Sequence, residues 1–276
     1  MNAITTITWL TFHEARRRRM VLAALLLGLG FLALYGLGLW LISRELSDNP
    51  SPASDTFFAL SLVTFAGLYV IHFLTVMLTI FASVDTIAGE ITSHTIQTIA
   101  VKPIARWQIV LGKWLGYALM LSPYVLLLSG GVVLLVYLTL GYLPPNLPQA
   151  LGLLVLESLV LLSLSLLFGT RLSTLANGVV LFMIYGMTFI GSWVEQIGAL
   201  LQSPGAVRVG IVTSLLMPVE ALWRRAAYLL QPAIVRDIPT PFSTASVPSG
   251  AMIVYAVIYA AVALLLAMRA LSRRDI

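Results

Sequence analysis

The chain has 276 residues, of which 59% are hydrophobic and only 10% are charged. Soluble domains are about 45–50% apolar and about 25% charged, so this chain has too few charges to cover a water-facing surface. The composition excludes a soluble enzyme, a DNA-binding module and a disordered protein as interpretations of the whole chain, and it indicates a lipid bilayer as the main solvent. The formal net charge of +5 favours anionic lipid over nucleic acid as a partner. Cysteine is absent, which excludes disulfides, Cys-ligated zinc and a Cys nucleophile.

The first 19 residues are basic and end in Arg16–Arg19, and an apolar run from Met20 to Ile42 follows them. A helix over that run, at 1.5 Å per residue, crosses roughly 30 Å of hydrocarbon. A secretory signal has a shorter apolar core, of about 7–15 residues, and a small-residue cleavage site behind it. We therefore predict an amphipathic interfacial helix over residues 1–19, with Trp9 and Phe12 in the membrane interface, and a retained first transmembrane helix.

Five further apolar runs predict five more spans, which makes six in an all-α integral membrane protein. Their bounds are Phe57–Ser83, Ile109–Leu140, Leu147–Phe168, Leu175–Val194 and Gly250–Met268. The run from Ile109 is too long for one perpendicular helix and contains Pro123, so we expect a kink or an extension out of the membrane. The segment 195–249 has short apolar stretches interrupted by six prolines, which favours short amphipathic or re-entrant helices over a seventh span. No repeat or linker divides the chain, so residues 1–276 are read as one domain.

The basic residues predict the orientation, because short cytoplasmic segments carry an excess of Lys and Arg. With the N-terminus inside, 11 of the 16 basic residues fall in inside segments and 5 in outside segments. We therefore expect a multi-pass protein of the inner (cytoplasmic) membrane with both termini in the cytoplasm and with segment 195–249 on the other side.

The segment 84–108 between the second and third spans is the most informative loop. It contains a polar, helix-competent stretch, Thr86–Ala100, and then Lys102-Pro103, which ends a helix. Such a loop displays a small rigid helix on which a cytoplasmic partner could push. Glu90 is expected to be an unpaired carboxylate suited to a basic group on that partner. The alternative is a solvated connector whose basic residues only follow the orientation rule.

This loop resembles that of the type-2 ABC exporter permeases, in the branch of the permease of the nitrous-oxide-reductase maturation transporter. The matching residues are Asp85, Gly89-Glu90, Thr95, Pro103, Arg106 and Gly112-Lys113. A second match is the outer segment Met217-Pro218-Val219-Glu220-Ala-Leu-Trp-Arg224, which is similar to the family's Asn-Pro-acidic-aromatic-Arg pattern. The chain departs from the family at His94, where Gly is usual, and at Met217, which replaces Asn.

The resemblance implies a transmembrane permease subunit of an exporter, with Asp85, Gly89, Glu90, Thr95, Pro103 and Arg106 coupling it to an ATPase. It also implies two copies of a separate cytoplasmic ATPase, which would carry ATP and Mg²⁺, and a second permease copy, in a homodimer. The sequence itself also indicates that this chain has no nucleotide-binding site. A phosphate-binding loop needs Gly-x-x-x-x-Gly-Lys-Ser/Thr, whereas Gly112-Lys113 is followed by Trp114 and Trp107 occupies the first glycine position. No catalytic or metal-binding motif is present, and no cofactor is expected in this chain.

Two ionisable residues fall near the middle of predicted spans, His72 in the second and Glu157 in the fourth. Ionisable groups inside a membrane are costly and often functional, so the two could bind a cation or relay protons. The alternative is that each faces the bundle interior and forms a hydrogen bond with a neighbouring Ser, Thr or carbonyl group.

The sequence thus predicts a permease subunit driven by ATP that a separate subunit hydrolyses. One rival is a proton-coupled secondary transporter that uses Glu157 and His72. Another is a non-transporting anchor for an extracytoplasmic partner, docked on residues 195–249. The sequence does not identify a substrate.

Overall fold

The computed structural model describes residues 3–48, 53–92, 104–231 and 246–273, and within these ranges every regular element is an α-helix. The helices are α1 (Ala3–Arg17), α2 (Arg19–Asp48), α3 (Ala53–Ser83), α4 (Asp85–Thr92), α6 (Arg106–Leu140), α7 (Leu147–Gly169), α8 (Thr174–Leu200), α9 (Pro204–Leu216), α10 (Val219–Leu230) and α12 (Gly250–Ser272).

Six of these helices are long and apolar enough to cross a membrane: α2, α3 (with α4), α6, α7, α8 and α12. This confirms the predicted all-α class and the six predicted spans. Most bounds agree closely, but α8 continues to Leu200, past the expected end at Val194. The first six residues of segment 195–249 therefore belong to a membrane helix and not to a loop.

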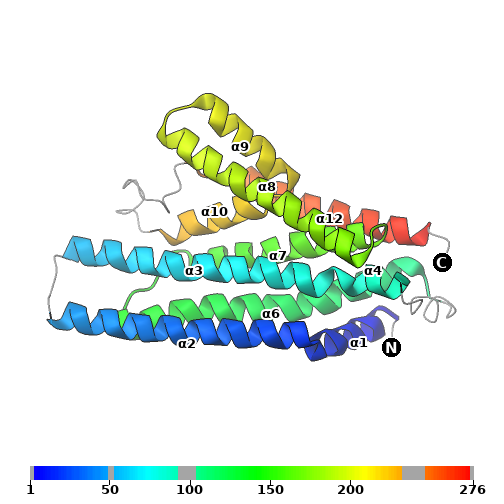
Figure 1. The fold of residues 1–276 in the computed structure, drawn as a ribbon, viewed down its shortest axis with the longest axis horizontal. Coiled ribbons are helices and arrows are strands. Elements are labelled where there is room, and N and C mark those ends of the chain that lie inside the picture. The colour runs from blue at the N-terminus through cyan, green and yellow to red at the C-terminus, as the bar shows by residue number, and fades with distance from the viewer. Residues whose placement is uncertain (1–2, 49–52, 93–103, 232–245, 274–276) are drawn as a thin grey trace.

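The core of the bundle forms around α7, which packs against α3, α6, α10 and α12 (Figure 1). α2 packs on α3 and α6 along one side of the bundle. In α7, Leu154, Leu161 and Leu166 are fully or almost fully buried, as expected of a helix surrounded by other helices. α1, α4 and the last turn of α12 lie at one end of the bundle, which we call the terminal end (Figure 1).

α1 lies along the first turns of α6. Two glycines of α6 permit this close approach, since a Cβ at Gly112 or Gly116 would lie 2.7 Å from a side-chain carbon of Ile7 or Thr11. Trp9 is 61% exposed, whereas Phe12 packs against the core. At 1.5 Å per residue, the 35 residues of α6 extend about 52 Å, beyond the thickness of the hydrocarbon. α6 continues as one helix through Pro123, and α1 packs against the first turns of this long helix.

α4 follows α3 after a break at Val84 and continues in nearly the same direction (Figure 1). The amide of Asn177 in α8 donates hydrogen bonds to the carbonyls of Val84 (3.2 Å) and Ser165 (3.0 Å). This buried side chain therefore joins α7 and α8 to the α3–α4 break. The predicted loop helix Thr86–Ala100 begins one residue earlier, at Asp85, and is helical to Thr92; residues 93–103 lie outside the described residues.

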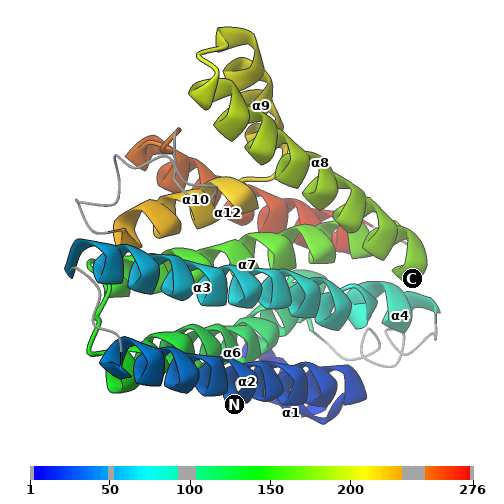
Figure 2. The same cartoon turned by 60° about the vertical axis from the view of Figure 1, so that its left-hand side comes forward.

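α8 and α9 form an arm that projects from the bundle (Figure 2). Their contact depends on glycine, because a Cβ at Gly210 of α9 would lie 2.6 Å from the Gly191 carbonyl of α8. α9 and α10 meet at Met217-Pro218 with a bend of 111°. The pair is either a broken seventh span or a re-entrant element, and its short helices agree with the prediction for this segment.

Candidate functional site

A buried polar cluster lies inside the helix bundle, and its centre is His72 of α3. The His72 Nδ1 lies 3.0 Å from each carboxylate oxygen of Glu157 in α7. The exposed fractions of the two side chains are 1% and 0%. The structure thus brings together the two residues that the sequence analysis singled out, and they bind each other instead of separate local partners.

The other face of the imidazole meets residues that sequence reasoning did not connect with it. The His72 Nε2 lies 3.3 Å from Glu220 Oε1 of α10 and 3.4 Å from the hydroxyl of Tyr185 in α8. The indole ring of Trp223, also on α10, stacks on the imidazole with ring centroids 4.9 Å apart. Four helices therefore contribute to this cluster, which consists of His72, Glu157, Tyr185, Glu220 and Trp223.

The arrangement places a carboxylate at each nitrogen of one imidazole. A neutral imidazole has a single N–H, so it can donate to only one of the two carboxylates. Hydrogen bonds at both nitrogens can form in two ways. In the first, the ring is an imidazolium and donates from both nitrogens. In the second, the ring is neutral, and its nitrogen without a hydrogen accepts from a protonated carboxyl group or from the Tyr185 hydroxyl. The cluster is therefore able to hold a proton that several groups share, at side chains that are buried in the bundle.

A second buried pair lies on the same face of α10, one helical turn from Glu220. The Arg224 guanidinium lies 2.8 Å from both oxygens of Glu195 in α8, with Nη2 donating to Oε2. The Ser246 hydroxyl donates to Glu195 Oε1 at 2.6 Å. Because an unpaired charge is costly in a membrane, this pair lets α10 pack inside the bundle.

α10 changes the interpretation of the outer segment 195–249. The stretch Met217–Arg224 was expected in this outer segment, and the structure shows that it leads into a helix that packs on α7, with Val219, Ala221 and Leu222 fully buried. The signal in the sequence was the spacing of Glu220 and Arg224, four residues apart beside an aromatic residue, which suits a helix with one polar face.

The predicted coupling residues meet mostly partners within the chain. The expectation that Glu90 is unpaired is wrong, because Glu90 Oε1 forms an ion pair with Lys113 Nζ of α6. The pair is nearly buried, with 17% of the Glu90 side chain and 5% of the Lys113 side chain exposed. Sequence reasoning recorded Lys113 only as part of the Gly112-Lys113 match to the family loop and missed this role.

Asp85 accepts hydrogen bonds from the Thr174 hydroxyl of α8 (3.0 Å) and from Arg18 (3.5 Å). Its side chain is 48% exposed. Gly89 leaves room for this carboxylate, since a Cβ there would lie 2.0 Å from Asp85 Oδ1. Arg106 is the first residue of α6 and is partly buried. Thr95 and Pro103, the other two predicted coupling residues, lie outside the described residues.

The two carboxylates of the cluster lie at different nitrogens of His72, so they do not converge on one point. In the described part of the chain, no group of three or more His, Asp and Glu side chains could hold a metal ion. The contacts of the cluster suit it to bind a proton and to position α10.

Residues 5–276 match the family model described as ABC-2 family transporter protein. No curated protein matches the chain.

Proposed function

Because the chain belongs to the ABC-2 family of transporter proteins, we propose that it is the permease subunit of an ATP-driven exporter. The observation that carries this proposal is the family match over nearly the whole chain. The family implies a membrane component that works with a separate ABC ATPase subunit, and the chain has no phosphate-binding loop of its own. Within the family, the loop motif Asp85 to Lys113 supports the branch of the nitrous-oxide-reductase maturation permease.

We place this multi-pass protein in the inner membrane with its terminal end in the cytoplasm. Arg16, Arg17, Arg18 and Arg19 lie there, as do Lys113 at the start of α6, Arg171 after α7 and Arg269 and Arg273 at the end of α12. Such an excess of basic side chains is typical of the cytoplasmic side. The full assembly would contain two permease copies and two ATPases, each with its own ATP and Mg²⁺.

The coupling element in this proposal is the segment 84–108, which begins with α4. A partner that moves α4 also acts on the Glu90–Lys113 pair, and through it on α6. Movement of α4 would reach α2 and α8 in the same way, because Asp85 contacts Arg18, which directly precedes α2, and Thr174 of α8. A shift of conformation requires contacts that differ between the two states, and these ion pairs are suited to such a change.

The polar cluster supports one second candidate, a proton-coupled transporter. His72 lies between Glu157 and Glu220, and a proton could pass from one carboxylate to the other through the two imidazole nitrogens. In this candidate, Glu157→Gln abolishes proton movement, because an amide does not ionise. The measurement is the collapse of a pH gradient in vesicles that contain only this chain.

The experiment that tests the main proposal starts from the tagged chain in its native membrane. After affinity purification, mass spectrometry is expected to find an ATPase with a Gly-x-x-x-x-Gly-Lys-Ser/Thr loop. In reconstituted vesicles, the permease is expected to change the ATP turnover of that subunit. If no ATPase co-purifies, and the chain alone dissipates a pH gradient, the secondary transporter replaces the exporter.

A further inference from the structure

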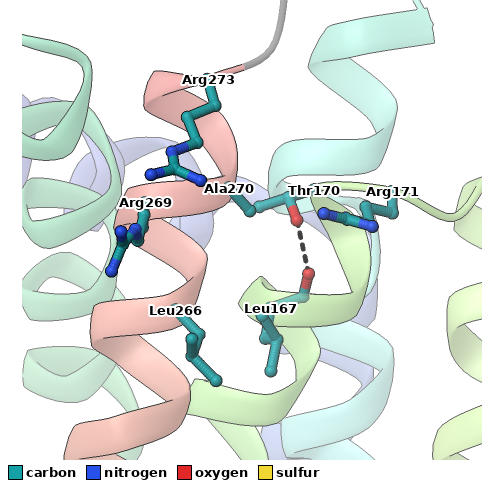
Figure 3. A pocket seen from close by; sticks show the side chains of 7 residues that line it. All are labelled: Leu167, Thr170, Arg171, Leu266, Arg269, Ala270 and Arg273. Atoms are coloured by element: carbon teal, nitrogen blue, oxygen red, sulfur yellow. Dashed lines mark hydrogen bonds between the residues drawn. The ribbon is translucent and has the colours of Figure 1, made fainter.

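A basic cavity of about 700 Å³ lies at the terminal end, between the end of α7 and the last turns of α12. This volume is within the range of about 300–1,000 Å³ that is usual for small-molecule sites. Figure 3 shows Arg269 and Arg273 on the α12 side and Arg171 across from them, with Leu167 and Leu266 further along the helices. Guanidinium groups therefore line one part of the cavity and aliphatic side chains the other.

The three arginines of the cavity are exposed and have no carboxylate partner among the residues that the structure describes. Three cations around one cavity repel each other, and an anion placed between them would relieve that repulsion. The planar guanidinium group matches the oxygens of a phosphate, with which it forms paired hydrogen bonds. The basic part of the cavity thus has the chemistry of a phosphate site.

The apolar part of the cavity continues onto the outer face of α12. Exposed aliphatic side chains follow that face along the span, at Val254, Val257, Ile258, Val262, Leu265 and Leu266. A free phosphate would use only the arginines, and it would leave this hydrocarbon surface without a ligand. A molecule with an anionic phosphate and acyl chains uses both parts.

We propose that this cavity is a specific site for an anionic phospholipid, with the phosphate held by Arg171, Arg269 and Arg273 and the acyl chains against α12. The site lies apart from the His72 cluster, and the proposal does not depend on what the protein transports. The bound lipid would join the turn after α7 to the last turn of α12.

The test uses the full chain, purified in neutral detergent and depleted of lipid. Native mass spectrometry measures binding of phosphatidylglycerol and of phosphatidylcholine, and inorganic phosphate serves as the competitor. The pocket variant combines Arg171→Gln, Arg269→Gln and Arg273→Gln. The control variant combines Arg16→Gln, Arg17→Gln and Arg19→Gln, which removes the same charge from exposed positions at the same end of the bundle. Unfolding temperatures verify that both variants are folded.

Wild type and the control variant are expected to bind one phosphatidylglycerol per chain at least about tenfold more tightly than phosphatidylcholine. The pocket variant is expected to lose at least about tenfold in affinity, which corresponds to about 1.4 kcal/mol.

Equal losses in the two variants would mean that only general surface charge attracts the lipid, and this would overturn the proposal. Displacement of the lipid by inorganic phosphate would make the cavity a site for free phosphate. If the pocket variant binds lipid normally but no longer co-purifies with the ATPase, the cavity is a protein contact and the lipid proposal is wrong.

Discussion

The Glu90–Lys113 ion pair offers a sharp test of how α4 is connected to the rest of the protein. Glu90→Lys places two lysines opposite each other in a nearly buried position. Loss of one partner of a buried pair costs about 3–5 kcal/mol, whereas an exposed pair contributes about 0–1 kcal/mol. With exposed fractions of 17% and 5%, the pair is close to the buried case, so we expect Glu90→Lys to lower the free energy of unfolding by about 3 kcal/mol.

The exchanged variant, Glu90→Lys with Lys113→Glu, restores opposite charges at the same positions. We expect it to recover most of the stability, with a coupling energy of about 2 kcal/mol or more between the two substitutions. The assay is thermal or denaturant unfolding in detergent, together with co-purification of the ATPase and ATP turnover in vesicles. Because Glu90 binds within the chain, the exchange is expected to restore coupling as well.

Two results would contradict this reasoning. Strictly additive losses in the exchanged variant would mean that Glu90 and Lys113 do not act as a pair. Recovered stability without recovered coupling would mean that Glu90 also contacts the ATPase, as the sequence alone suggested.

Three further predictions concern the cluster, the arm and the orientation. Glu157→Gln is expected to keep ATPase assembly and permease-dependent ATP turnover, because the amide oxygen still accepts from the imidazole; lost turnover with intact assembly would mean that coupling needs an ionisable group at position 157. Gly210→Ala is expected to lower the free energy of unfolding by about 1–3 kcal/mol, since the added Cβ would lie 2.6 Å from a carbonyl of α8. Gly186→Ala is its control, having nothing within 4 Å, and a similar loss in both would disprove the steric explanation. A reporter fused after Ile276 is expected to be cytoplasmic and one inserted near Pro239 extracytoplasmic; a cytoplasmic signal near Pro239 would contradict the orientation.

Hydropathy predicts the six spans well because a long apolar run has few alternatives to crossing the bilayer. α7 illustrates this, since it begins at the predicted Leu147 and ends one residue after the predicted Phe168. Hydropathy does not reveal α10, because this helix has only 12 residues and contains Glu220 and two arginines. It is too short and too polar to be predicted as a membrane span.

The contacts of the candidate site could not be predicted, because they join residues far apart in the chain. His72 and Glu220 are 148 residues apart, and no periodicity in either helix indicates that they meet. Glu90 and Lys113 are only 23 residues apart, yet their contact depends on α4 following α3 along the side of α6. The sequence identified His72 and Glu157 as ionisable residues within predicted spans. Which side chains they contact depends on how the helices pack.

The polar contacts of α10 also bear on the order in which the protein is made. The partners of Glu220 and Arg224, which are His72 and Glu195, leave the ribosome before α10 does. An arginine in the middle of a lone helix costs about 2.5–3.5 kcal/mol on insertion, so α10 is poorly suited to enter lipid by itself. It is expected to enter by docking on helices that are already in the membrane. A nascent chain that stops before α10 would leave Glu195 without its Arg224 partner and His72 without Glu220. These buried polar contacts would form only once α10 has been added.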